Sequence, residues 1–213
     1  MSLRVKICGL STETAVAAAI AGGADFLGFV FFPPSPRNVA PEQVRALCAA
    51  VPEGIHRVGL FVDADDDTIG RVLSQAPLGM LQFHGKESPA RVAQARARWG
   101  LPIIKALPVA EPADLTEASA YSDAADWLLF DARPPKGAQL PGGNGVAFDW
   151  RILSGQSFPL PWMLSGGLSA ATLAEAVKLT GAKAVDVSSG VESAPGVKDP
   201  ERIREFLENS GIL

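Results

Sequence analysis

The alternation of two kinds of segment most limits what this chain can fold into. Eight short runs rich in aliphatic and β-branched residues occur at 3–8, 26–31, 57–62, 79–83, 103–106, 127–130, 161–164 and 184–187. Alanine- and leucine-rich segments with helical spacing lie at 14–21, 41–50, 68–73, 89–99, 115–121, 170–178 and 200–207. Strand runs that alternate with helices are typical of βαβ units. Most runs also lack apolar/polar alternation, which indicates parallel strands covered on both faces.

No linker or change of composition divides the 213 residues. Eight βα units without a boundary predict an α/β chain that forms a single (β/α)8 TIM-barrel domain over residues 1–213. An open, doubly wound sheet is the alternative, but the glycine fingerprint GxGxxG does not follow the first strand. In a barrel, catalytic and binding residues lie at the carboxyl ends of the strands and in the loops that follow them.

The composition excludes several classes of protein. Hydrophobic residues make up 47% of the chain and charged residues 20%, so the chain can bury a core and is not disordered. A total of 19 Lys and Arg against 23 Asp and Glu gives a net charge of −4. General nucleic-acid scaffolds and membrane-surface proteins are usually basic, so we expect neither nucleic acid nor membrane as a partner.

The cysteine count and the apolar stretches predict a cytoplasmic location. Two cysteines, Cys8 and Cys48, are too few for a secreted fold built on disulfides. The first ten residues, MSLRVKICGL, lack the long apolar region of a signal peptide. The most apolar stretch, 15–32, is interrupted by two glycines and by Asp25, so we expect no membrane span.

Cys8 stands at the end of the first strand run, and strand alternation places it on the same side as Arg4 and Lys6. This side should face the barrel interior, because the opposite side is apolar. A lysine one pleat below favours the thiolate, so we expect a lowered pKa and a role as general base or nucleophile. A small buried hydrophobe is the alternative, and it is our expectation for Cys48 within its helical segment.

Asp131 ends the sixth strand run after four apolar residues. A carboxyl group in that position is partly desolvated, which favours its protonated form and suits a general acid, although a turn-starting role is equally compatible. The Pro- and Gly-rich segment 132–147 follows, and a loop of this length is typical of a lid. Asp149 is expected at the start of the next helix.

Glycines and serines follow the last two strand runs. Ser165-Gly166-Gly167-Leu168-Ser169 leads into a helix, and Ser188-Ser189-Gly190 follows the eighth run. Backbone N–H groups in such turns approach anions, and barrels often bind phosphate with the loops after strands seven and eight. The pattern predicts a phosphorylated ligand bound by these two loops.

Three further polar residues are candidates for substrate binding. Arg37 follows three prolines after the second strand run, and such a rigidly placed arginine suits a carboxylate or phosphate, although a solvated loop arginine is the alternative. Gln82 and His84 share a face at the end of the fourth run. A single histidine without clustered Cys or His ligands predicts no metal site. Lys105 and Asp186 are expected to pair with Lys6 in the interior, and His56 is expected to be structural or exposed.

These residues occur within a longer series of motifs. They are Lys-Ile-Cys-Gly at 6–9, Gly-Phe-Val-Phe at 28–31, Ser-Pro-Arg at 35–37, Gln-Phe-His-Gly at 82–85, Phe-Asp at 130–131, Gly-Gly-Asn-Gly at 142–145, Phe-Asp-Trp at 148–150, Ser-Gly-Gly-Leu at 165–168 and Val-Asp-Val-Ser-Ser-Gly-Val-Glu at 185–192. In this order they resemble the phosphoribosylanthranilate isomerases of tryptophan biosynthesis, over essentially the whole chain.

The resemblance implies an Amadori rearrangement of N-(5-phosphoribosyl)anthranilate to 1-(2-carboxyphenylamino)-1-deoxyribulose 5-phosphate. It places the general acid at Asp131, the general base at Cys8 and the contact with the anthranilate end at Arg37. It also places the substrate phosphate on four residues: Gly166, Gly167, Ser189 and Gly190. It implies a phosphorylated small-molecule substrate and no metal or organic cofactor, with a monomer or homodimer as the assembly.

Two other classes of function stay open from the residues alone. An aminoaldose isomerase of histidine biosynthesis also uses a phosphate-binding barrel, but it carries carboxylates at the ends of strands one and six, whereas Cys8 occupies the first position here. A non-catalytic module that binds a sugar phosphate would need neither Cys8 nor Asp131.

Overall fold

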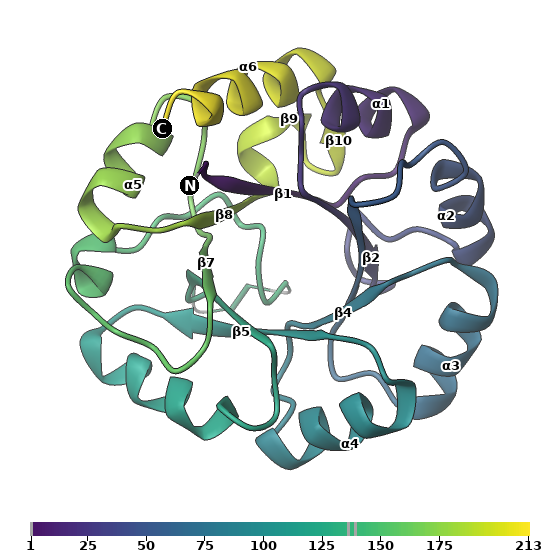
Figure 1. Ribbon diagram of the computed structural model, residues 1–213, viewed down its shortest axis with the longest axis horizontal. Helices are drawn as coiled ribbons and strands as arrows, with labels where there is room; N and C mark the ends of the chain where they lie inside the picture. The colour runs from purple at the N-terminus through teal and green to yellow at the C-terminus, as the bar shows by residue number, and fades with distance from the viewer. Residues whose placement is uncertain (1, 136, 139) are drawn as a thin grey trace.

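The structure is a computed structural model that describes residues 2–135, 137–138 and 140–213. Eight parallel strands form a closed barrel in chain order (Figure 1). They are β1 (Arg4–Cys8), β2 (Phe26–Phe31), β3 (His56–Phe61), β4 (Met80–Phe83), β5 (Ile103–Val109), β6 (Trp127–Ala132), β7 (Trp162–Leu164) and β8 (Ala184–Val187). Pairing of β1 with β8 closes the ring. The predicted (β/α)8 barrel is confirmed, and the open doubly wound sheet is wrong.

The helices form an outer ring around the strands (Figure 1). The α-helices are α1 (Glu13–Ala21), α2 (Pro41–Leu47), α3 (Asp66–Gln75), α4 (Pro89–Trp99), α5 (Leu173–Thr180) and α6 (Pro200–Gly211). Capping side chains and prolines start them: Ser88 accepts from the Arg91 N–H, and Pro89 occupies the first turn of α4. Because the strands are parallel, their carboxyl ends and the loops that follow them lie on one side of the barrel.

The connections after β5 and β6 are 3₁₀ helices, η1 (Pro112–Tyr121) and η2 (Trp150–Leu153). The α-helix expected at 115–121 is therefore correct in place and wrong in type. Hydroxyl groups in η1 bond to carbonyls three residues back, for example from Thr116 to Ala113 at 2.7 Å, which favours the tighter turn. As expected, Asp149 begins the next helix, where its carboxylate accepts from the Arg151 N–H.

Two hydrophobic layers support the barrel. The large outer layer lies between the sheet and the ring of helices. A smaller cluster fills the amino-terminal half of the interior with side chains that include Phe26, Met80 and Leu129. The guanidinium of Arg4 lies 4.3 Å from the centre of the Phe26 ring, and His56 stacks on the same ring. His56 is therefore exposed and stacked on Phe26, as the expectation of a structural or exposed residue allows.

Two connections at the carboxyl ends of the strands depart from the regular pattern. The loop between β6 and η2 lies across the barrel opening (Figure 1). After β8, a short 3₁₀ helix, η3 (Ser189–Val191), leads into an antiparallel hairpin of β9 (Glu192–Ala194) and β10 (Val197–Lys198). The sequence patterns predict the loop but not the hairpin.

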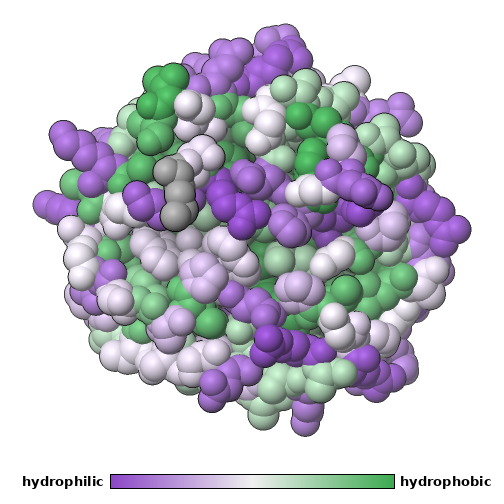
Figure 2. Space-filling view, in the orientation of Figure 1, coloured by the Kyte–Doolittle hydropathy of each residue, from purple (hydrophilic) through white to green (hydrophobic). Residues whose placement is uncertain are grey.

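The outer surface is mixed. On the face drawn in Figure 2, hydrophobic residues lie in separate small groups among hydrophilic ones. Among the described residues, no helix is both long and apolar enough to cross a bilayer.

Candidate active site

A cavity opens at the carboxyl ends of the strands, beneath the β6–η2 loop. Cys8, Arg37, His84, Asp131, Gly166, Gly167 and Ser189 line it. Of the remaining predicted site residues, Gln82 and Gly190 are not among the lining residues. The fold therefore collects on one cavity seven residues that come from six different strand–loop junctions.

Cys8 lies at the end of β1 with 4% of its surface exposed. Lys6 and Cys8 both point into the barrel, as strand alternation predicts. Gly28 on β2 leaves room for them, since a Cβ there would lie 3.0 Å from Lys6 Nζ and 3.1 Å from Cys8 Sγ. The thiol thus meets the cavity on one side and a buried ammonium on the other.

The predicted lowering of the Cys8 pKa is wrong. Burial raises the pKa of the Cys8 thiol above its usual value, and Lys6 offsets this only in part. The ammonium of Lys6 lies 2.8 Å from Asp186 Oδ1, and the negative charge of Asp186 raises the pKa of Cys8 further. The resting thiol is therefore protonated at neutral pH, and a base at this position acts through a small thiolate population.

The interior charges form two pairs rather than one cluster. Lys6 pairs with Asp186 as expected, and the Ser165 hydroxyl donates to Asp186 Oδ2 at 3.2 Å. Burial lowers the pKa of Lys6, but Asp186 and Cys8 outweigh burial and raise it overall. Lys105 does not join this pair: its Nζ lies 2.9 Å from Glu87 Oε2, in the loop after β4. The prediction for Lys105 is wrong because its partner comes from a loop and not from a strand.

Asp131 lies at the carboxyl end of β6, opposite the thiol side of the cavity. Its Oδ1 accepts from the Ala132 N–H at 2.9 Å, and its Oδ2 lies 3.2 Å from His84 Nε2. Gly142 of the β6–η2 loop covers this pair, because a Cβ there would lie 2.6 Å from His84 Nε2 and 2.7 Å from Asp131 Oδ2. A carboxyl group with one edge toward the cavity and a loop above it can deliver a proton in a site shielded from water.

Gln82 contacts His84 rather than the cavity. Gln82 is fully buried, and its Nε2 lies 3.0 Å from His84 Nδ1. This contact holds the imidazole ring against Asp131. The common face predicted for Gln82 and His84 is confirmed, but only His84 can touch a ligand in this arrangement.

The loops after β7 and β8 face the cavity at one end. Gly166 and Gly167 have φ angles of +84° and +70°, which favour glycine. Within the described part of the chain, their N–H groups donate to no protein acceptor. Ser188 and Ser189 complete the wall. Gly190 packs against the loop after β7, since a Cβ there would lie 1.9 Å from the Leu168 carbonyl oxygen. Gly166 and Gly167 thus offer a cradle of backbone donors that suits an anion, whereas Gly190 lies behind the cavity wall.

Arg37 is buried, not solvated. Its Nε and Nη2 donate to the two carboxylate oxygens of Glu192, at 2.7 and 2.9 Å. Nη2 also donates to the carbonyl of Gly143 in the β6–η2 loop at 3.0 Å. The guanidinium therefore has a fixed orientation at the rim of the cavity.

An apolar wall that the sequence analysis missed lies beside Cys8. It contains Val30, Phe32, Leu60 and Val62 from β2, β3 and the residues that follow these strands. These residues could have been found by applying strand alternation to the second and third runs. Glu192 and Lys198 were also missed, although Glu192 ends one of the motifs that carry the family resemblance.

Comparison with known proteins agrees with this geometry. Residues 5–209 match the family described as "PRAI: N-(5'phosphoribosyl)anthranilate (PRA) isomerase". The chain is 57% identical over 208 residues to the N-(5'-phosphoribosyl)anthranilate isomerase of Cereibacter sphaeroides, with 98% of each chain covered. It is 56% identical over 214 residues to that of Rhodospirillum centenum, with both chains covered fully.

Solved structures give the same result. The crystal structure of phosphoribosyl anthranilate isomerase from Thermotoga maritima superposes with a TM-score of 0.88 at 33% identity, over 99% of this chain and 100% of that one. A structure of the isomerase in complex with reduced 1-(o-carboxyphenylamino)-1-deoxyribulose 5-phosphate has a TM-score of 0.82 at 32% identity, over the same shares of the two chains.

Proposed function

Because this chain belongs to the N-(5'-phosphoribosyl)anthranilate isomerase family, we propose that Cys8 and Asp131 carry out the family's reaction as general base and general acid. The chain is an aldose–ketose isomerase of tryptophan biosynthesis. It converts N-(5-phosphoribosyl)anthranilate into 1-(2-carboxyphenylamino)-1-deoxyribulose 5-phosphate by an Amadori rearrangement.

The reaction begins at the acid. Asp131 gives its proton to the furanose ring oxygen as the bond between that oxygen and C1 breaks. The lone pair of the anthranilate nitrogen forms a double bond to C1, which yields an open-chain Schiff base. Proton delivery during the bond cleavage avoids a free alkoxide, which is why an acid at this atom speeds the step.

The second step belongs to the base. The Cys8 thiolate removes the proton from C2, the electron pair of that bond forms a C1–C2 double bond, and the electrons of the C–N double bond return to nitrogen. The resulting enolamine tautomerises to the ketone by moving a proton from the C2 hydroxyl to C1. Binding of a substrate with a cationic Schiff base favours the thiolate, whose pKa is raised in the free protein.

The substrate is anchored at its two anionic ends. The phosphate lies on the backbone donors of Gly166 and Gly167 and on Ser189, and the anthranilate carboxylate meets Arg37. The aromatic ring packs on the apolar wall next to Cys8, where Val30 and Leu60 exclude water. This pose places C1 and C2 between the two proton-transfer groups.

The observation that carries the proposal is the shared cavity of Cys8 and Asp131, between an anion cradle and a fixed arginine. Loss of the fluorescence of phosphoribosylanthranilate on addition of the protein tests it. Purified Cys8→Ala and Asp131→Asn variants should fold and lose turnover. Near-normal turnover in Cys8→Ala would exclude this residue as the base.

The assembly and location are proposed on narrower grounds. A monomer or homodimer is supported by a Thermotoga maritima relative described as a dimeric phosphoribosylanthranilate isomerase from which monomers were generated. A cytoplasmic location is supported by the two cysteines, which are free thiols as expected in a reducing compartment. Size-exclusion chromatography with light scattering measures the mass of the assembly.

A further inference from the structure

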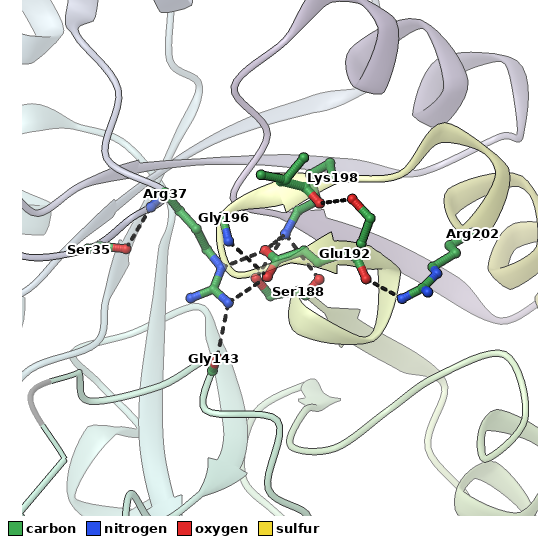
Figure 3. Close-up of polar contacts among 10 residues, drawn as sticks. Ser35, Arg37, Gly143, Ser188, Glu192, Gly196, Lys198 and Arg202 are labelled. Carbon is green, nitrogen blue, oxygen red and sulfur yellow. Dashed lines mark hydrogen bonds and ion pairs between the residues drawn. The ribbon is translucent and has the colours of Figure 1, made fainter.

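Two basic side chains, Arg37 and Lys198, are buried at the rim of the cavity together with one acidic side chain, Glu192 (Figure 3). Their exposed fractions are 6%, 6% and 7%. Glu192 is central, since its carboxylate accepts from both Arg37 and Lys198 and also from the Gly196 N–H at 3.1 Å. Burying a charge costs free energy unless an opposite charge is paired with it. Each of these three side chains therefore depends on its partners for its position.

The cluster carries one unbalanced positive charge. Two cations share one carboxylate, and Arg37 is the member that lines the cavity. Burial raises the pKa of Glu192, but hydrogen bonds from Arg37 and the nearby Lys198 outweigh it, so the pKa lies below its usual value and the carboxylate stays ionised. A bound carboxylate next to Arg37 would bring the cluster to neutrality.

The same cluster reaches the anion cradle. Lys198 Nζ donates to the carbonyl and to the hydroxyl of Ser188, at 3.0 and 3.2 Å. Ser188 directly precedes Ser189 and lines the cavity. The hairpin that carries Glu192 and Lys198 therefore contacts both the arginine and the serine loop (Figure 3).

We propose that Glu192 is a positioning residue for the isomerase: it fixes the guanidinium of Arg37 so that its Nη1 group receives the anthranilate carboxylate. Lys198 holds Glu192 in place and joins the pair to the phosphate loop. The inference rests on the proposed contact between Arg37 and the carboxylate. Glu192 touches no reacting atom, so its effect is on substrate recognition and not on proton transfer.

A purely structural role for Glu192 gives a different result. If the ion pairs only fastened the hairpin to the barrel, loss of the carboxylate would weaken all ligands alike. If Glu192 orients Arg37, its loss weakens only ligands that carry the carboxylate. The comparison therefore needs two ligands that differ in this group alone.

The test uses reduced 1-(2-carboxyphenylamino)-1-deoxyribulose 5-phosphate and the matching analogue with a plain phenyl ring. Calorimetry gives the ratio of their dissociation constants. A hydrogen bond to a charged group corresponds to a factor of about ten to a hundred, so Glu192→Gln should reduce the preference for the carboxylated ligand by about that factor. Glu201→Gln is the matched control, because it also replaces a glutamate with glutamine, but in an exposed ion pair with Arg204. It should leave the ratio unchanged.

A second variant keeps the test valid if Glu192→Gln does not fold. Glu192→Gln combined with Lys198→Gln removes one charge of each sign and keeps the net charge of the cluster. Its preference for the carboxylated ligand should fall as well, because Arg37 loses its support. An unchanged ratio in the folded double variant, or an equal loss for both ligands, would overturn the proposal.

Arg37→Met separates this inference from the proposed function. If Arg37→Met leaves the ratio unchanged, the proposed contact of Arg37 fails. If Arg37→Met lowers the ratio and Glu192→Gln does not, only the positioning role fails. If Glu192 acts through Arg37, then adding Glu192→Gln to Arg37→Met should lower the ratio no further.

Discussion

The two sides of the cavity differ in the kind of structure that surrounds the reactive side chain: strands on one side and loops on the other. On the thiol side, Cys8 stands above the Lys6–Asp186 pair, and all three residues come from the adjacent strands β1 and β8. On the acid side, Asp131 ends its strand and is contacted by His84, just beyond β4, and by Gly142 of the loop. Strand register fixes the surroundings of Cys8, the proposed base, whereas loop conformation fixes those of Asp131, the proposed acid. The base side should therefore be stiff, and the acid side adjustable.

The largest expected effect is common to both sides. Cys8→Ala and Asp131→Asn should each lower kcat/KM by about 10²–10⁴-fold, because each removes one proton-transfer group. Steady-state kinetics on the fluorescent substrate measure this, and circular dichroism checks the fold. Equally small losses of kcat/KM in the two variants would contradict the proposed roles of Cys8 and Asp131.

Stability should separate the two sides. Lys6→Met leaves Asp186 buried without its cation, which should cost about 3–5 kcal/mol of unfolding free energy. His84→Asn removes one contact at the rim of the acid side and should cost about 1 kcal/mol or less. Urea denaturation of both variants gives the difference, and a larger cost for His84→Asn would reverse the comparison.

The pH dependence of a variant that lacks the acid should report the base side. In Asp131→Asn no carboxylic acid has to be protonated, and burial and Asp186 raise the pKa of Cys8, so the residual kcat/KM should still be rising with pH above about 8.5, the ordinary value for a thiol. Adding Asp186→Asn removes a negative charge that disfavours the thiolate, so the pKa falls and the rising limb moves to lower pH. A limb that stays in place in this double variant would contradict the assignment of the base.

Two glycines make room for Cys8 and Asp131, one on each side of the cavity. Gly28→Ala on β2 crowds Cys8 and Lys6 inside the sheet and should cost about 1–3 kcal/mol of stability. Gly142→Ala crowds His84 and Asp131 from a loop that can shift, so it should lower kcat/KM with little loss of stability. Thermal unfolding together with kinetics distinguishes the two, and equal losses of stability would show that the loop is as stiff as the strand.

The same difference between strand residues and loop residues explains which contacts the sequence could predict. The pairing of Lys6 with Asp186 follows from strand alternation and from the closure of β1 onto β8. The positions of Cys8 and Asp131 at strand ends follow from the run lengths. The contacts of Lys105 with Glu87 and of Arg37 with Glu192 could not be predicted, since a loop residue has no fixed periodicity that would place its side chain.

The pKa of Cys8 marks a second limit. The neighbouring Lys6 is visible in the sequence, but the burial that outweighs it depends on the whole ring of strands, including Gly28 and the apolar wall. An effect that arises from many residues at once cannot be read from one motif. The 3₁₀ helix η1 is similar, because its hydroxyl-to-carbonyl bonds compete with an α-helix that the composition equally allows.

The β9–β10 hairpin has a consequence for synthesis of the chain. Cys8, Arg37 and Asp131 leave the ribosome before Glu192 and Lys198 do, and those two residues also follow the last barrel strand. A nascent chain that already holds the proposed base, the proposed acid and Arg37 still lacks the carboxylate that we propose orients the arginine. On this proposal, selectivity for carboxylated ligands is acquired near the end of translation. If the protein is produced as two fragments divided just before residue 192, the long fragment should become selective for carboxylated ligands only when the short carboxyl-terminal fragment is supplied.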